Sequence, residues 1–296
     1  MPPFFITIVT AVILGTLARF FMLKVDYRQY PSYPHGVVTH LSLGFIAATL
    51  GAVALPALLE KEFAAVSFLA LAAQQFREVR TTEREMLLHL DKSELVQRGP
   101  DYIEGIARVF ESRNYLVILT ALIVSTATHF FNPLLGIISS ILAVAAGNRL
   151  MTGRNIKDIA RVRSGEIRFE GPNVFVENIH IMNLGGEETR ETIIERGLGV
   201  IIEPFNDNER ETLANNGQRM ALAHEAASQL GVYKDVDTPE FTPLVRRDKD
   251  TGRIGLLILP IERDMEFLIT AIKGVPVLES ATGKPLRSRA GKKAED

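Results

Sequence analysis

Residues 36–59 read GVVTHLSLGFIAATLGAVALPALL, a run that contains no Asp, Glu, Lys or Arg. A transmembrane helix needs about 20 consecutive, mostly apolar residues to cross the hydrocarbon core of a bilayer. This run meets that requirement, and four further apolar runs lie on either side of it: Phe4–Leu23, Phe63–Phe76, Tyr115–Phe131 and Pro133–Leu150. The sequence therefore predicts an α-helical membrane domain with about five transmembrane helices. The run at 63–76 is short and ends in two glutamines, which leaves open whether it crosses fully.

The charges between these runs predict how the membrane domain is oriented. Lys and Arg gather on the cytoplasmic side of membrane proteins. Seven of them fall in the segment 77–114 and five more between residues 149 and 163, whereas the turn at 60–62 holds one lysine and the turn at 132–133 none. This alternation requires that all five runs cross. We predict a multi-pass protein of the cell membrane, with its N-terminus outside and its C-terminal domain in the cytoplasm.

The second half of the chain predicts a different kind of domain. Residues 165–279 carry 12 Lys and Arg against 21 Asp and Glu, and no apolar run there is long enough to span a bilayer. Binding to nucleic acid needs a basic surface that replaces the counterions of phosphates, so this acidic balance argues against a nucleic-acid partner. The chain has no cysteine, which excludes disulfides, thiolate metal sites and cysteine nucleophiles. We predict no metal site and no cofactor.

The pattern along the chain predicts two domains and a tail. The membrane domain covers 1–164 and includes a cytoplasmic amphipathic helical insert at 77–114, the acidic α/β domain covers 165–279, and a disordered basic tail covers 280–296. In the α/β domain, strand-like and helix-like patterns alternate, which indicates a small sheet, expected to be parallel or mixed, covered by helices. The expected strands are Glu166–Glu170, Val174–Met182, Leu198–Glu203, Ile254–Ile261 and Val275–Leu278, and the expected helices are Glu187–Arg196, Asn206–Leu230 and Glu262–Lys273.

The insert contains the stretch Gly99-Pro100-Asp101-Tyr102-Ile103-Glu104-Gly105-Ile106-Ala107. Its Gly-Pro pair breaks the preceding helix, and Asp101 and Glu104 fall in the first turn of the next one. Carboxylates in a first turn are stabilised by the free N–H groups and by the helix dipole. A capped helix start therefore explains the stretch, and the alternative is a docking or reactive site at the membrane surface. Gly105 favours the alternative or a close helix contact, because glycine costs roughly 1 kcal/mol inside a helix.

Residues Tyr102, Ile103, Glu104, Gly105, Ile106 and Ala107 spell YIEGIA, and the chain resembles the family that is named for this hexapeptide. The hydrophobic first half and the soluble second half extend the resemblance over the whole chain. The resemblance implies a membrane protein of endospore-forming bacteria that acts in sporulation together with a small soluble partner protein of a "capping" type. It also implies a link to regulated proteolysis.

The polar side chains of Arg19, His40 and His129 lie inside the apolar runs. Such groups usually face the interior of a helix bundle and find partners there, so we interpret them as helix-packing or interfacial groups. The alternative is a proton or ion pathway, which the absence of Asp and Glu from all five runs disfavours. By the predicted orientation the two histidines lie at opposite sides of the membrane, which argues against a shared metal ion.

Two functions follow from these observations. The first is a multi-pass membrane scaffold or regulatory protein that acts in the lipid bilayer through a complex with a small partner. The sequence leaves open whether the protein also forms homo-oligomers. The second is a membrane-bound regulatory protease that uses carboxylates at the cytoplasmic membrane surface, with Asp101, Glu104 and Asp158 as candidates, because a carboxylate pair sharing a proton can activate water. His224 and Glu225 begin a zinc-protease motif, but Ser228 stands where the second histidine belongs. The sequence favours the scaffold and does not decide whether the protein is an enzyme.

Overall fold

The computed structural model describes residues 4–26, 36–150, 153–234 and 241–282. The chain divides into two compact units. A helical unit comprises Met1–Leu87 and Ile106–Thr152, and an α/β unit comprises Leu88–Gly105 and Gly153–Asp296. Part of the predicted helical insert, Leu88–Gly105, thus belongs to the same compact unit as the sheets. Most of the predicted basic tail, at 283–296, lies outside the described residues.

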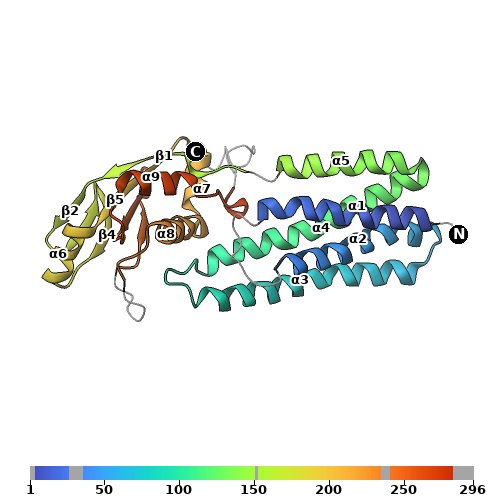
Figure 1. The fold of residues 1–296 in the computed structure, drawn as a ribbon, viewed down its shortest axis with the longest axis horizontal. Helices are drawn as coiled ribbons and strands as arrows, with labels where there is room; N and C mark the ends of the chain where they lie inside the picture. The colour runs from blue at the N-terminus through green and yellow to red at the C-terminus, as the bar shows by residue number, and fades with distance from the viewer. Residues whose placement is uncertain (1–3, 27–35, 151–152, 235–240, 283–296) are drawn as a thin grey trace. The chain divides into compact units, whose positions relative to one another are not determined.

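Five helices run through the described part of the first unit (Figure 1): α1 (Phe5–Asp26), α2 (Gly36–Leu59), α3 (Phe63–Asp91), α4 (Pro100–Phe130) and α5 (Pro133–Leu150). α2 and α5 have the bounds that their apolar runs predict. Three helices, α1, α2 and α4, are long and apolar enough to cross a membrane, and the described part of α5 contributes a shorter apolar helix, Pro133–Gly147. α3 is apolar only in its first half. The structure thus supports association with a membrane, while five crossings stay a prediction.

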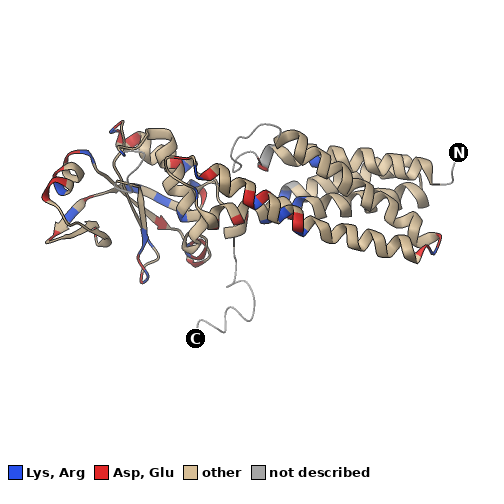
Figure 2. Ribbon diagram, turned by 90° about the horizontal axis from the view of Figure 1, so that it is seen from below, with Lys and Arg blue, Asp and Glu red and all other residues tan. Residues whose placement is uncertain are grey.

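The helical unit packs through small residues and turns large apolar side chains outward. A Cβ atom on Gly15 would lie 2.8 Å from the Cβ of Ala48, so α1 and α2 approach closely there. Small residues allow such approaches between membrane helices. Large apolar side chains are exposed along the outside of the helices, among them Phe20, Phe68 and Leu142. Figure 2 shows few charged residues along most of the length of the helices in this unit. An outward apolar surface of this kind is suited to lipid.

The described part of the α/β unit contains two antiparallel sheets. The larger has the strand order β1 (Ala160–Gly165), β5 (Leu198–Pro204), β7 (Ile254–Ile258) and β6 (Leu244–Arg247), and every neighbouring pair is antiparallel. The smaller is the meander β2 (Ile167–Glu170), β3 (Asn173–Val176) and β4 (Ile179–Asn183). The expectation of a parallel or mixed sheet was wrong. Short turns join β2 to β3, β3 to β4 and β6 to β7, and strands joined by short turns must run antiparallel.

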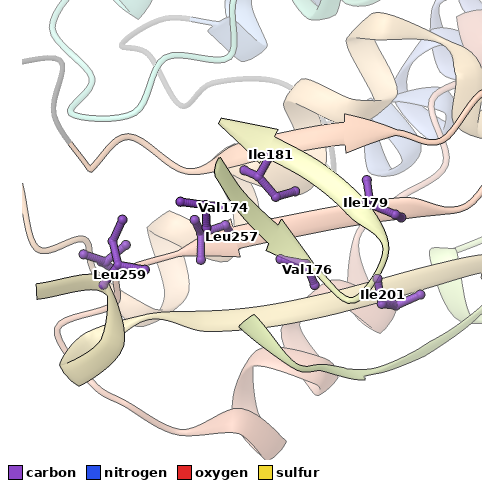
Figure 3. Close-up of a cluster of buried hydrophobic side chains, with 8 residues drawn as sticks. Val174, Val176, Ile179, Ile181, Ile201, Leu257 and Leu259 are labelled. Carbon is purple, nitrogen blue, oxygen red and sulfur yellow. The ribbon is translucent and has the colours of Figure 1, made fainter. Parts of the chain in front are cut away.

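The larger sheet lies between two layers. On one face, Ile201 of β5 and Leu257 of β7 pack against side chains of the meander and against Ile193 of α6 (Glu187–Arg196), as Figure 3 shows for most of this cluster. Side chains alternate between the faces of a strand, so the buried Val200 and Leu256 point to the other face. That side is covered by α8 (Asn216–Leu230) and α9 (Met265–Gly274). Coverage on both faces explains why β5 and β7 read as continuous apolar runs.

Several predicted elements differ from the observed ones. The expected helix Asn206–Leu230 is two helices, α7 (Asp207–Ala214) and α8. They are separate because Asn215 between them adopts an extended conformation. Its side chain accepts a hydrogen bond from the backbone N–H of Gln218 and so caps α8. The expected strand Val174–Met182 is the β3–β4 hairpin, with Glu177 at a positive φ of 54° in its turn. Val275–Leu278 forms only an isolated bridge, between Pro276 and Asn155. Strands β1 and β6 were not predicted, since their short sequences ARVRSG and LVRR are rich in arginine.

Candidate functional site

The helical unit encloses a cluster of charged side chains centred on Asp26, the last residue of α1. One carboxylate oxygen of Asp26 accepts a hydrogen bond from Arg19 Nη1 at 2.7 Å, and the other accepts from Arg113 Nε at 3.0 Å. Arg19 lies seven residues earlier on α1, two turns away on the same face, and Arg113 lies on α4. One acid therefore holds two arginines through both of its oxygens.

A histidine extends this cluster to α2 and α3. Arg19 Nη2 lies 3.0 Å from His40 Nδ1, and His40 Nε2 lies 3.8 Å from Glu83 Oε1. Arginine has only donors, so Nδ1 must accept and the ring proton of the neutral histidine sits on Nε2, facing the Glu83 carboxylate. The ring also packs on Phe110 of α4, with 5.0 Å between ring centroids. The cluster thus ties together four helices.

Burial makes this arrangement energetically consequential. Arg19, Asp26, His40, Glu83 and Arg113 are each at most 5% exposed. Burying a charge is expensive unless it is paired and hydrogen-bonded, and here two arginines face two carboxylates, so the cluster is balanced. Such a cluster favours one arrangement of the helices over others.

The side chain of Asn114, next to the cluster, is buried with its hydrogen-bonding groups unused among the described residues. Asn114 follows Arg113 on α4, lies one turn from Phe110 and is fully buried. Neither its amide nitrogen nor its amide oxygen has a hydrogen-bond partner among the described residues. In the described parts of the chain no group of three or more His, Asp or Glu side chains is placed to hold a metal ion.

The sequence predicted only part of this cluster. Arg19 and His40 were candidates and lie together, whereas His129 stacks on Phe4 with 5.2 Å between ring centroids. Asp26 and Glu83 were missed because both follow an apolar run rather than lying inside one. A helical spacing signal did exist for each: Asp26 falls two turns after Arg19, and Glu83 falls one turn before the buried Leu87.

The hexapeptide lies mostly inside the protein. Tyr102, Ile103, Gly105, Ile106 and Ala107 are buried, and Glu104 is half-buried. A Cβ atom on Gly105 would overlap the hydroxyl oxygen of Ser280, which belongs to the same α/β unit. The loop before it is fixed by Asp91, whose carboxylate accepts hydrogen bonds from the backbone N–H groups of Arg98 and Gly99 at 2.8 and 2.9 Å. The buried members of the motif therefore act as packing groups in this structure.

The other two predicted carboxylates, Asp101 and Asp158, accept hydrogen bonds within the α/β unit. Asp101 accepts a hydrogen bond from the side-chain amide of Asn216 on α8. Asp158 accepts from the backbone N–H of Asn155 at 2.8 Å and closes a short 3-10 turn. His224 is buried, and its Nδ1 lies 2.6 Å from the carbonyl oxygen of Val96. A catalytic role for Asp101, Glu104 or Asp158 stays a prediction.

Comparison with known proteins places the chain among its relatives. The family model described as "YIEGIA protein" matches residues 7–288. The chain belongs to the YIEGIA family. It is 45% identical over 285 residues to a protein of Bacillus subtilis (strain 168) named "Uncharacterized protein YphB", and the match covers 96% of each chain. No solved structure matches the chain significantly.

Two substitutions in the YIEGIA hexapeptide distinguish a packing role of the motif from a chemical role. Gly105→Leu is expected to lower the amount of folded protein, because its side chain collides with Ser280 and overpacking typically costs about 1–3 kcal/mol. Glu104→Gln is expected to leave insertion and stability unchanged, since the amide keeps the shape of a half-buried side chain. Protein abundance in the membrane fraction and the apparent Tm measure both. Loss of Glu104→Gln from the membrane fraction would remove the basis for a functional role of Glu104.

Proposed function

We propose that this protein is a multi-pass membrane scaffold of regulatory function that acts in sporulation through a complex with a small soluble protein. Three apolar helices support the membrane anchor, and the paired charges that join four helices support a fixed platform. The curated relative comes from a spore-forming bacterium, which supports the process. The basic segments at 77–114 and 149–163 support an N-terminus outside and an α/β unit in the cytoplasm.

A hollow on the α/β unit carries this proposal, because it offers a partner an anchoring point. The hollow has a volume of about 260 Å³ and is lined by the end of α6, the start of β5 and the start of α9. Ile194 of α6, one of the residues that line the hollow, is 57% exposed, and Met265 and Arg263 also line it. Protein interfaces are often anchored by a few apolar side chains that enter such hollows, surrounded by polar groups. We expect the small partner to insert an apolar side chain here.

Ile194→Glu is expected to weaken binding of the partner by about tenfold or more, because it places a charge in a contact that must be dry. Its exposure means that the fold is retained. The full-length protein would be purified from sporulating cells, the co-purifying small protein identified, and its affinity measured with wild type and variant. Phe205→Glu is the matched control, since Phe205 is equally exposed but lies outside the hollow. Equal affinity in all three proteins would contradict this docking site.

Protein half-lives in sporulating cells distinguish the scaffold from the protease. Wild type, a deletion and Glu104→Gln would be compared at matched protein level. For a scaffold we expect no protein to change its half-life in Glu104→Gln. Accumulation of one or a few proteins in both mutants, at unchanged rates of synthesis, would favour the protease.

A further inference from the structure

A cavity of about 600 Å³ lies in the α/β unit, beside the segment 92–99 that leads into α4. Residues of this segment line the cavity together with side chains of α8, with Lys234 and with residues 242–243. Cavities of roughly 300–1,000 Å³ are the usual sites of small ligands in proteins. Every lining residue belongs to the same compact unit, so the cavity is a property of that unit alone.

Hydrogen bonds fix the segment 92–99 against the rest of the lining. His224 Nδ1 of α8 lies 2.6 Å from the carbonyl oxygen of Val96, and Lys234 Nζ donates to the carbonyl oxygen of Leu95 at 3.2 Å. A carbonyl oxygen can only accept, so the histidine donates from Nδ1. The two walls are thus joined by direct contacts, and the cavity is preformed, as most small-molecule sites are.

Part of the lining is apolar. The apolar side chains that face the cavity are those of Leu95, Val96, Met220, Ala223 and Pro243. Leu95 is 42% exposed, so its side chain still contacts water. An apolar group that enters the cavity removes such surface from water, which is favourable by roughly 25 cal/mol for each Å². A ligand with an apolar body therefore fits this part of the lining.

The charged part of the lining is net positive. Its charged side chains are those of Lys92, Lys234 and Glu94. Arg98 Nη1 lies 3.1 Å from a Glu94 oxygen and 3.9 Å from an oxygen of Asp91, so this arginine offsets one of the two acids beside it. In the part of the chain that the structure describes, neither Lys92 nor Lys234 has a carboxylate within ion-pair distance. Two lysines, one arginine and two acids leave one positive charge over, which a single negative charge balances.

We propose that this cavity binds a small organic monoanion, a carboxylate with an apolar body. The carboxylate pairs with Lys92 and Lys234, and the apolar body lies against Leu95 and the side chains of α8. Hydrogen bonds between an ammonium group and a carboxylate are charge-assisted and stronger than those between neutral groups. A doubly charged anion is disfavoured, because Glu94 lines the same cavity.

NMR titration by saturation transfer tests the site with the full-length protein in bilayer discs of phosphatidylcholine, and empty discs give the background. Benzoate is the probe, benzamide is its neutral analogue and benzylamine its cationic one. We expect benzoate to bind about fivefold or more tightly than benzamide, because hydrogen bonds to charged groups contribute more than those between neutral groups. Benzylamine should not bind, since it brings a second positive charge to the lysines.

Four substitutions test the roles of the charged side chains. Lys92→Gln and Lys234→Gln should each lower the affinity for benzoate about tenfold. The amide of Lys234→Gln can still donate to the Leu95 carbonyl. Glu94→Gln keeps an acceptor for Arg98 and should raise the affinity severalfold, an effect that a purely structural role would not produce. Lys273→Gln is the matched control, because Lys273 is exposed on α9 outside the cavity.

The apparent Tm of each variant should equal that of wild type. If Lys234→Gln lowers it, Lys92→Gln decides the test, because Lys92 is exposed. Equal affinity for benzoate in wild type and both lysine variants would overturn the proposal, and so would equal affinity for benzoate and benzamide. Hexanoate, which has a flexible apolar body, would be titrated in parallel. Failure of both carboxylates to bind at millimolar concentration would also contradict the site.

Discussion

An Asp26→Ala variant is expected to lose about 3–5 kcal/mol of folding free energy, the usual cost of removing one partner from a buried ion pair. Asp26 is the shared acceptor of Arg19 and Arg113, so its removal leaves two guanidinium groups buried without their carboxylate. A chain of this size changes its Tm by roughly 2–4 °C per kcal/mol, which predicts an apparent Tm about 10 °C lower. Thermal unfolding in detergent and abundance in the membrane fraction measure the effect.

The control for Asp26→Ala is Glu62→Ala, which removes an exposed acid of the same helical unit. Exposed charges contribute only about 0–1 kcal/mol, so this variant should behave as wild type. The double variant Asp26→Asn with Arg113→Gln removes one charge of each sign and should recover part of the loss. If Asp26→Ala were as stable as Glu62→Ala, the cluster would not hold the helices together.

The charge cluster shows how far the sequence could predict this unit. The apolar runs identified the helices because a membrane imposes a composition that is visible residue by residue. The polar residues Arg19 and His40 stood out inside those runs. Their partners Glu83 and Asp26 did not, because a charged side chain beyond an apolar run looks like ordinary solvent-exposed sequence. Only the packing of four helices shows that these side chains turn inward.

In the α/β unit as well, the sequence predicts local features and misses those that depend on residues far apart in the chain. α6 was predicted with its observed bounds because its signals are local: acidic residues in its first turn and Gly197 directly after it. The direction of the strands was not, because pairing joins residues far apart, such as Val200 of β5 with Leu256 of β7. The hollow beside Ile194 is assembled from separate segments in the same way, and it leaves no motif in the sequence.

Gly51→Leu is expected to be the most damaging single change in the helical unit that does not alter charge. A Cβ atom at position 51 of α2 would overlap the backbone carbonyl oxygen of Ile118 on α4 and lie 3.0 Å from the Cβ of Ala121. Backbone cannot rotate away as a side chain can, so the two helices must separate. We expect a loss of about 3 kcal/mol or more, at the upper end of the range for overpacking, and little folded protein in the membrane fraction.

Gly147→Ala on α5 is the matched control for Gly51→Leu, since its added Cβ atom would meet only the end of the Met22 side chain, at 3.8 Å. Alanine is favoured over glycine in a helix by roughly 1 kcal/mol, so Gly147→Ala should be neutral or stabilising. Gly51→Ala gives an intermediate step, because it already brings the Cβ atom against the Ile118 carbonyl. Stability that falls from Gly51→Ala to Gly51→Leu while Gly147→Ala holds would establish the close contact of α2 with α4. Equal stability of Gly51→Leu and Gly147→Ala would contradict that contact, because no arrangement with these two backbones touching has room for a leucine side chain.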